Sequence, residues 1–380
     1  MHDMNLLSTD QPEYAAPVLA VCGFSGAGKT TLLEAVIPVL VGHGLAVAVV
    51  KHDVHGIEVD KPGKDSDRLF RAGASISLGA PGERFEHRHD VEPLEAAIAR
   101  LARDHDLVLV EGYKHTPLSK FWLHSPEEDA NLIPDGVNNI VAALDRDCDR
   151  PAALLHFLEG WLFRAWQERP LRGGLLVGGK STRMGTPKQL LRVAGQAGGW
   201  TMAEISAAAL AGALGLGNIY ALGAGELSEL LTAMPRLVDA PGIAGPAAGL
   251  LAAHRWWPDA AWIVSACDHP ALIAEHISWM RAQRRPGCWA VIPRQSDGHP
   301  CPTLALYEPQ ALAVLERLAR ASEGRDAQPS LLLDLPRIET PEVPAELAVG
   351  WRNVNTPEEL RAEERRIRAE SIARAIEKES

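Results

Sequence analysis

The first half of the chain alternates short apolar runs with helical patterns. The runs at 18–22, 45–50 and 107–110 are uninterrupted and aliphatic, which is typical of parallel strands covered on both faces. Segments 30–41 and 91–103 lie between them and show apolar residues at helical spacing. This half is therefore predicted to be an α/β unit built on a parallel sheet.

The second half repeats the pattern with different sequences. Apolar runs at 175–177, 219–222 and 262–266 predict strands, and the segments around 202–214 and 246–255 predict helices. The order of strand, glycine-rich loop and helix occurs at the start of both halves. The chain is therefore predicted to contain two consecutive α/β domains.

The boundary is expected where one pattern stops and the next begins. Residues 151–169 form an amphipathic pattern, predicted to be a helix closed by Pro170 and by the pair Gly173-Gly174. A strand with its own glycine loop follows directly. The expected domain limits are 1–168, with the connecting helix at 151–168, and 171–380. The last stretch, 357–380, mixes Glu with Arg and is predicted to be a solvated helix.

Length and charge support this picture. At roughly 150 residues per domain, 380 residues favour two domains. The net charge of −11 argues against broad nucleic-acid binding, which depends on clustered Lys and Arg. The 5 cysteines are odd in number and form no C-x-x-C pair, so we expect a reducing, cytoplasmic compartment.

Two segments bear on targeting and on membranes. The first 14 residues have no basic region followed by an apolar core, so no signal peptide is expected. The run 205–225 is uncharged and long enough to span a bilayer, but Gly217-Asn218 interrupts it. It is therefore predicted to be a buried helix, a turn and a strand, with no membrane span.

The first glycine loop, 23–30, reads GFSGAGKT and fits the P-loop pattern G-x-x-x-x-G-K-[ST] after a predicted strand and before a predicted helix. Its glycines let backbone N–H groups point at phosphate oxygens. Lys29 would reach the β and γ phosphates, and the Thr30 hydroxyl would bind Mg²⁺. The predicted nucleotide contacts are Gly23, Ser25, Gly26, Ala27, Gly28, Lys29, Thr30 and Thr31.

Other candidates in this half are acidic or imidazole groups. Glu111 ends a predicted strand at the carboxyl edge of the sheet, where it can hold Mg²⁺ through water. Zinc binding by His52 and His55 lacks a third ligand at a supporting spacing, so a polar substrate-facing loop is favoured. The chain has no N-K-x-D segment, so the base preference stays open. No Gln that could position water lies next to Glu111 in the sequence, so at most weak hydrolysis of the bound triphosphate is expected.

The second glycine loop, LLVGGKSTRMGTPK at 175–188, is not a P-loop. Gly178-Gly179 allows close approach to a phosphate or a base, and Arg183 and Lys188 place two cations beside a triphosphate. Nucleotidyl transfer needs such cations, because negative charge grows on the α-phosphoryl oxygens and on the departing pyrophosphate.

Three further pieces suit the same chemistry. Asp268 follows an apolar strand and precedes a Pro turn, a position from which it can hold Mg²⁺ on the nucleotide phosphates. Asp239 precedes a glycine turn at Gly245, which suits close contact with a base. Asn355 lies just before the last helix, for which Thr356 is the predicted N-cap, and offers an oxygen to the same metal.

The first half resembles the molybdopterin-guanine dinucleotide biosynthesis adaptor family. The resemblance rests on KHDVHGIEVDKPGKDSDRLFRAGA at 51–74 and LVLVEGYKH at 107–115, and covers about 18–121. It implies a P-loop NTPase-type parallel sheet that binds GTP at Lys29 and Thr30. It also implies contributions from Asp65, Ser66 and Glu111.

Residues 174–360 resemble the molybdenum cofactor guanylyltransferase family, through the G-G loop, a downstream Lys, G-P-x-A-G, C-D-x-P and N-x-N-T-P-E-E-L segments. A Rossmann-like nucleotidyltransferase fold of the nucleotide-diphospho-sugar transferase type is implied. So are these roles: nucleotide contacts at Leu176, Val177, Gly178, Gly179, Lys188, Asp239, Gly245 and Asp268; catalysis by Arg183, Lys188 and Asp268; metal binding by Asp268 and Asn355.

The implied reaction transfers GMP from GTP to molybdenum-loaded molybdopterin, with Mg²⁺ as cofactor and pyrophosphate as product. Molybdoenzymes that accept the cofactor, or their chaperones, are the implied partners. RMGTPK at 183–188 is one residue shorter than the usual family form, so a cytidylyltransferase that uses CTP stays an alternative. A non-catalytic GTP switch that delivers the cofactor is the second alternative. Fusion of the two domains favours channelling between them.

Overall fold

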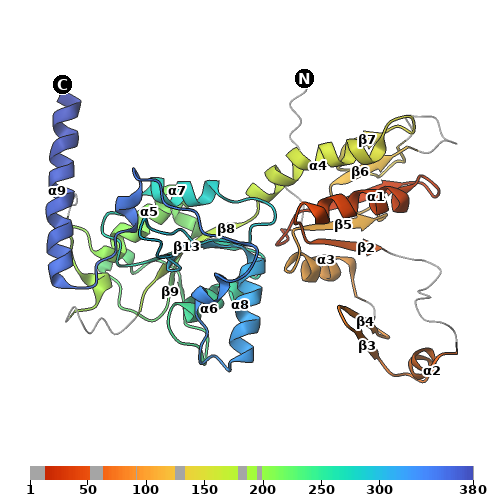
Figure 1. Ribbon diagram of the computed structural model, residues 1–380, viewed down its shortest axis with the longest axis horizontal. Helices are drawn as coiled ribbons and strands as arrows, with labels where there is room; N and C mark the ends of the chain where they lie inside the picture. The colour runs from red at the N-terminus through yellow and green to blue at the C-terminus, as the bar shows by residue number, and fades with distance from the viewer. Residues whose placement is uncertain are drawn as a thin grey trace.

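The computed structural model describes residues 13–51, 63–90, 92–124, 133–178, 186–194 and 199–379, and shows two separate sheets with helices on both faces (Figure 1). The predicted α/β class is confirmed for both halves. Within the described ranges, no helix is long and apolar enough to cross a membrane.

The first sheet is parallel throughout, in the order β2-β5-β1-β6-β7. Helices α1 and α4 cover one face and α3 covers the other. The strands are β1 (Val18–Gly23), β2 (Val47–Lys51), β5 (Leu107–Glu111), β6 (Lys120–Leu123) and β7 (Ile140–Leu144). The helices are α1 (Lys29–Gly42), α3 (Leu94–Ala102) and α4 (Arg150–Gln167).

A small antiparallel hairpin stands apart from this sheet. It consists of β3 (Ile76–Ala80) and β4 (Glu83–His87), and the short helix α2 (Asp65–Arg71) packs beside it. None of the α2 residues is buried. Figure 1 shows α2 and the hairpin well away from α1.

The second sheet is mixed, in the order β10-β9-β8-β11-β13-β12-β14, with β13 antiparallel to both of its neighbours. Helices α5 and α7 pack on one face, and α6 and α8 on the other. The strands are β8 (Leu171–Leu176), β9 (Ile219–Leu222), β10 (Arg236–Leu237), β11 (Ala261–Ala266), β12 (Ala290–Val291), β13 (Leu304–Tyr307) and β14 (Ile338–Glu339). The helices are α5 (Met202–Leu214), α6 (Pro246–Trp256), α7 (Ala274–Ala282), α8 (Pro309–Ala321) and α9 (Pro357–Glu379), with short 3₁₀ turns that include η1 (Lys188–Leu190) and η2 (Leu216–Asn218).

The long uncharged run at 205–225 folds as predicted, into the rest of α5, the turn η2 and strand β9. Helix α5 begins at a capping box, in which the Thr201 hydroxyl accepts from Glu204 N–H and the Glu204 carboxylate accepts from Thr201 N–H. Most of its side chains are buried between β8 and α7.

The interpretation of Gly173-Gly174 as a helix stop is wrong, because both glycines lie inside β8. A Cβ on Gly173 would come within 3.0 Å of Ile219 Cγ2 and 3.2 Å of Leu214 Cδ1. A Cβ on Gly174 would come within 2.5 Å of Leu222 Cδ1. Glycine is therefore present in this strand because neighbouring side chains occupy the space over it.

The two domains meet at a polar joint. Asp106 is fully buried there and accepts hydrogen bonds from Ala46 N–H in its own domain and from Trp289 Nε1 across the joint, the latter at 2.8 Å. Its second oxygen also pairs with Arg337. Beside it, Arg103 makes a bidentate pair with Asp259, at 2.8 and 3.0 Å.

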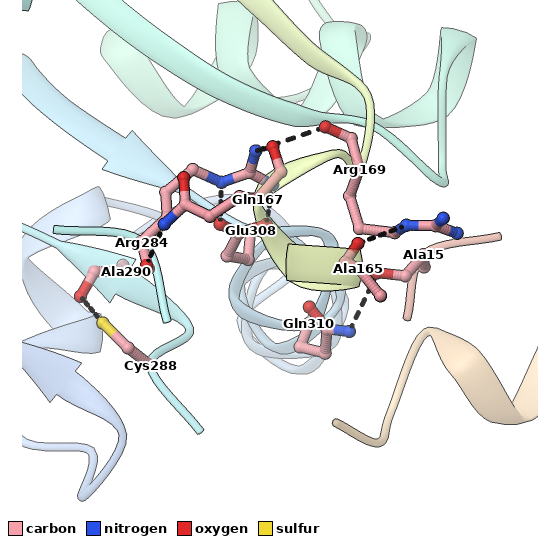
Figure 2. Close-up of polar contacts among 9 residues, drawn as sticks. All are labelled: Ala15, Ala165, Gln167, Arg169, Arg284, Cys288, Ala290, Glu308 and Gln310. Carbon is pink, nitrogen blue, oxygen red and sulfur yellow. Dashed lines mark hydrogen bonds and ion pairs between the residues drawn. The ribbon is translucent and has the colours of Figure 1, made fainter. Parts of the chain in front are cut away.

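Figure 2 shows the polar contacts of the joint around the carboxyl-terminal end of α4. Arg284 and Glu308 form a buried ion pair, with Nε–Oε1 at 2.6 Å, and Arg284 also donates to the carbonyl of Arg169. Gln167 donates to the carbonyl of Arg284. Gln310, the second residue of α8, donates to the carbonyl oxygens of Ala102, His105 and Ala15.

The joint lies at the amino-terminal edge of each sheet. Asp106 directly precedes β5 and Ala46 directly precedes β2, while on the other side Arg169 and Asp259 come just before β8 and β11. The carboxyl-terminal edges of both sheets therefore face outward, away from each other, as Figure 1 shows.

Candidate functional site

The P-loop lies at the carboxyl-terminal edge of the first sheet, between β1 and α1. Gly26 and Gly28 adopt φ values of 77° and 83°, which favour glycine, and Gly28 is the N-cap of α1. A Cβ on Gly23 would come within 2.6 Å of the Leu123 carbonyl oxygen. The first-turn N–H groups of α1 point out of the helix end, where an anion is favoured.

The Lys29 side chain folds back over this loop. Its ammonium donates to the carbonyl oxygens of Gly23, at 3.1 Å, and of Phe24, at 2.8 Å. A lysine in this position can exchange carbonyl oxygens for phosphate oxygens with little movement of its stem. The predicted contacts Ser25, Ala27 and Thr31 lie on the same loop and helix start.

Thr30 and Glu111 are brought together, as a shared metal site requires. Thr30 Oγ1 donates to Glu111 Oε1 at 2.8 Å, although the two residues are 81 positions apart in the chain. Lys51, at the end of β2, places its ammonium 3.5 Å from the same carboxylate oxygen. Sequence reasoning did not single out Lys51, because only the pairing of β2 with β5 puts it beside Glu111.

Arg150 is a second residue that sequence reasoning missed. It lies at the start of α4 and donates to three carbonyl oxygens: Ala27 in the P-loop at 2.7 Å, His124 after β6 at 2.7 Å, and Asp145 after β7 at 3.0 Å. The guanidinium therefore ties the P-loop to the two neighbouring strand ends.

The remaining candidates of the first domain are not gathered at the P-loop. Asp65 and Ser66 begin α2, away from α1 in Figure 1, and Asp65 is exposed and 4.0 Å from Arg68. The implied role of these two residues has no support in this arrangement. His52 and His55 lie outside the described residues. Within the described ranges, no cluster of three or more His, Cys, Asp or Glu side chains is placed to hold a metal ion.

The second candidate site lies at the carboxyl-terminal edge of the second sheet. Leu176 ends β8, Val177 is buried, and Gly178 is exposed. A neighbouring turn at Gly223 and Gly225 packs directly against them, and a Cβ on Gly223 would come within 2.3 Å of the Val177 carbonyl oxygen. These two glycines shape the loop and were missed, since their spacing resembles no known motif. Gly179 and Arg183 lie outside the described residues.

Lys188, Asp268 and Asn355 converge next to this loop. The Lys188 ammonium donates to Asn355 Oδ1 at 2.7 Å and lies 3.5 Å from Asp268 Oδ2. The Lys188 and Asp268 side chains are each one-fifth exposed. Val354 N–H donates to the Asp268 carbonyl oxygen at 2.9 Å, which holds the segment before α9 against the end of β11.

Two buried residues, Cys267 and His269, flank Asp268 in the chain. His269 is buried, and its Nε2 lies 3.4 Å from Asp268 Oδ1. Burial lowers the pKa of His269, so the ring is neutral near pH 7. Cys267 donates its thiol hydrogen to the Leu176 carbonyl oxygen, and burial raises the pKa of the thiol. Cys267 is therefore a structural contact between β8 and β11 and no nucleophile.

Asp239 and Gly245 lie at the edge formed by β9, β10 and α6. Gly245 has φ 68° and is the N-cap of α6, as the glycine turn predicts. Asp239 Oδ1 would lie 3.5 Å from a Cβ on Gly223, so its carboxylate is adjacent to the loop around Val177. Partial desolvation raises the pKa of Asp239.

The donor sets of both sites fit magnesium. Mg²⁺ prefers oxygen ligands and is usually held by one or two carboxylates together with substrate phosphates. The first site offers the Thr30 hydroxyl and the Glu111 carboxylate, which already share a hydrogen bond. The second offers Asn355 Oδ1 and the Asp268 carboxylate. Asp268 Oδ1 is buried 3.4 Å from His269 Nε2 and forms no hydrogen bond within the described part of the chain.

Fold and sites together define the class of this protein: a P-loop domain joined to a nucleotidyltransferase domain. Comparison with known proteins agrees. Residues 18–146 match the family described as molybdopterin guanine dinucleotide synthesis protein B, and residues 173–334 match the MobA-like NTP transferase domain.

Individual relatives match one domain or the other. A molybdopterin-guanine dinucleotide biosynthesis adapter protein of Haemophilus influenzae is 38% identical over 161 residues, which are 38% of this chain and 89% of the relative. A probable molybdenum cofactor guanylyltransferase of Opitutus terrae is 32% identical over 200 residues, which are 52% of this chain and 96% of the relative.

A molybdenum cofactor biosynthesis bifunctional protein of Synechocystis is 27% identical over 187 residues, which are 46% of this chain and 53% of the relative. The chain therefore belongs to the molybdopterin-guanine dinucleotide biosynthesis adapter family in its first part and to the molybdenum cofactor guanylyltransferase family in its second. Both resemblances seen in the sequence are confirmed.

Proposed function

We propose that the second domain, with limits 171–380, transfers GMP from GTP to molybdenum-loaded molybdopterin and releases pyrophosphate. The first domain, 1–168, binds GTP at its P-loop as the adapter of this reaction. The observation that supports the transferase assignment best is the meeting of Lys188, Asp268 and Asn355 beside Gly178. Guanylyltransferase relatives support guanine as the base.

The chemistry is a displacement at the α-phosphorus of GTP. The terminal phosphate oxygen of molybdopterin forms the new P–O bond, and the bond to the bridging oxygen of pyrophosphate breaks. The nucleophile is already an anion, so no strong general base is required. Catalysis then depends on position and on charge neutralisation.

Each residue of the second site has a role in this step. Lys188 neutralises phosphate oxygens from its position between Asn355 and Asp268. Asp268 and Asn355 would hold Mg²⁺, which supplies positive charge to the triphosphate. Arg183 supplies a further cation, and Leu176, Val177, Gly178 and Gly179 contact the nucleotide. Asp239 and Gly245 lie on the side where the guanine would bind.

The first site binds without transferring a group. Gly23, Gly26 and Gly28 shape the loop, Lys29 contacts the β and γ phosphates, and Thr30 with Glu111 holds Mg²⁺. No described side chain near Glu111 is a Gln placed to orient water, so we propose at most weak hydrolysis of GTP by this domain.

The test is pyrophosphate release with molybdopterin and either GTP or CTP. Wild type should release pyrophosphate with GTP, and Asp268→Asn should lose at least about a hundredfold in rate, because a group that stabilises transition-state charge is weakened. Glu275→Gln, an exposed acid on α7, is the matched control and should keep the wild-type rate.

Three outcomes would contradict the proposal. Transfer from CTP alone would make the enzyme a cytidylyltransferase. No pyrophosphate from wild type with either nucleotide would favour a non-catalytic switch that delivers the cofactor. An unchanged rate in Asp268→Asn would remove Asp268 from the mechanism.

A further inference from the structure

Lys51 is the side chain at the first site that neither the P-loop motif nor the metal pair accounts for. It ends β2, directly opposite Glu111 in the parallel pairing of β2 with β5. Strand β5 lies between β2 and β1, so Lys51 and the P-loop approach Glu111 from opposite sides. In the structure, Lys51 Nζ and Thr30 Oγ1 both contact the same oxygen, Glu111 Oε1.

The two side chains of the Lys51–Glu111 ion pair differ in solvent exposure. The Glu111 side chain is only 10% exposed, whereas that of Lys51 is 49% exposed. A half-exposed ammonium on a flexible stem can change partners, and an ion pair of this kind contributes little to stability. Lys51 is therefore positioned by Glu111 without being locked onto it.

We propose that Lys51, which pairs with Glu111 in this structure, is an additional phosphate-binding residue of the first nucleotide site and contacts the terminal phosphate of a bound nucleoside triphosphate. This inference rests on the proposed binding of GTP by the P-loop. If Glu111 and Thr30 hold magnesium together with the nucleotide, the ammonium loses its place on this carboxylate, because like charges repel.

The nearest new partner for the displaced ammonium is the triphosphate itself. Thr30 adjoins Lys29, the residue that reaches the β and γ phosphates in a P-loop, so the end of the triphosphate lies beside Glu111. Lys114 adds a cation at the same edge, with its Nζ 5.0 Å from the centre of the Phe24 ring. Lys29 on the P-loop carbonyls, Lys51 on Glu111 and Lys114 over Phe24 give this edge of the sheet several positive charges, which suits a ligand with several negative charges.

The experiment is calorimetric titration of the full chain with guanosine triphosphate, diphosphate and monophosphate in the presence of magnesium. Binding to the first site is the part of the signal that Lys29→Ala removes. Lys51→Met should weaken triphosphate binding by about tenfold, since one charge-assisted contact is lost, while monophosphate binding stays within about twofold. Lys51→Arg keeps the positive charge, so it should retain most of the wild-type preference for the triphosphate over the monophosphate.

Lys64→Met is the matched control. Lys64 is an exposed lysine at the N-cap of α2, away from α1 in Figure 1, and its loss should leave all three affinities unchanged. Thermal unfolding of each variant checks that the fold is kept.

A second pair of variants separates phosphate binding from simple neutralisation of Glu111. The Glu111→Gln substitution removes the carboxylate charge. If Lys51 only neutralised that charge, replacing Lys51 in this background would not change nucleotide affinity. Lys51→Met should still weaken triphosphate binding in that background. No effect there, or an equal effect on all three nucleotides, would overturn the proposal. Failure of wild type to bind any triphosphate at the P-loop would instead contradict the proposed function.

Discussion

Each candidate site holds an ammonium group on oxygen atoms of its own chain. Lys29 lies on two P-loop carbonyls, and Lys188 lies on Asn355 and Asp268. Both lysines were found in the sequence because each belongs to a short, contiguous glycine motif. Lys51 and Gly223 were not found, because their roles depend on distances between strands that no local pattern encodes.

His254 is a residue whose pKa, and therefore its effect on stability, depends on the residues that bury it. It is buried in α6, and Nδ1 has no hydrogen-bond partner within the described residues. Burial lowers its pKa to about 4, and the charged groups around it are Glu316, Arg103, Asp259 and Arg255. The folded protein therefore holds this ring neutral over a range in which the unfolded chain binds a proton.

The sign of the pH effect follows directly. Above pH 6.5 the ring is neutral in both states and has no effect. Between pH 6.5 and 4 the unfolded state binds a proton that the folded state does not, so the free energy of unfolding decreases as the pH is lowered, by up to about 3 kcal/mol. His254→Leu should make the loss of unfolding free energy between pH 7 and pH 5 smaller by about 2 kcal/mol.

Urea unfolding at the two pH values measures this difference. Other buried histidines with lowered pKa, such as His276, remain in both proteins and cancel in the comparison. A variant that loses as much stability as wild type over this range would contradict the assignment.

At the scale of elements, strands and helices were predicted well where their pattern is strong. The predicted runs around β1, α1, β5, α5, β9, α6 and β11 all fold as expected, with ends shifted by a few residues at most. Strand β8 shows the limit. The local sequence predicts that Gly173 and Gly174 end the preceding helix. In the structure both belong to strand β8, where they pack against Leu214, Ile219 and Leu222.

Helix α4 connects the P-loop to the joint between the domains. Its first residue, Arg150, binds the Ala27 carbonyl, and its last residue, Gln167, binds the Arg284 carbonyl. An arginine in the first turn is unfavourable for the helix dipole, so its three carbonyl contacts must outweigh this effect.

Arg150→Met should therefore weaken guanosine triphosphate binding at the first site by about tenfold, because the P-loop loses its contact with α4. Thermal stability should fall slightly, because three carbonyl oxygens lose their donor. Arg150→Lys should recover little, since an ammonium cannot reproduce the fork of the guanidinium. Arg164→Met, an exposed arginine near the other end of α4, is the control. Equal binding by Arg150→Met and wild type would show that this contact is not needed.

At the scale of the molecule, the joint decides how the two sites relate. Each sheet presents its amino-terminal edge to the joint, so the P-loop and the Asp268 site lie at opposite outer ends (Figure 1). Strands β1 and β8 each have 6 residues and run away from the joint. At about 3.3 Å per residue this separates the sites by ~40 Å or more.

This geometry argues against direct channelling between the two sites of one chain. A tether raises the effective concentration of two sites only if the linked parts can meet. Here Asp106 and the Arg103–Asp259 pair hold the domains with their sites turned outward. A bound molecule cannot pass directly from one site to the other within one chain.

Spin labels test the arrangement. Labels on the exposed Cys148 and on Thr356→Cys, in a Cys301→Ser background, should give one narrow distance distribution at ~40 Å or beyond, unchanged by guanosine triphosphate. Arg103→Met combined with Arg337→Met should broaden the distribution, because two of the ion pairs across the joint are lost. A distance near 20 Å in wild type would contradict the outward orientation.

The sequence by itself determined the class of each domain, the two glycine loops and the acids that follow their strands. These features depend on short-range pattern: apolar runs set the strands, and glycine spacing sets the turns that face phosphates. Tertiary structure alone decided which further side chains reach these sites, such as Lys51 at Glu111 and Arg150 at the Ala27 carbonyl, and how the domains face. The physical reason is that strand order and domain docking depend on packing between segments far apart in the chain.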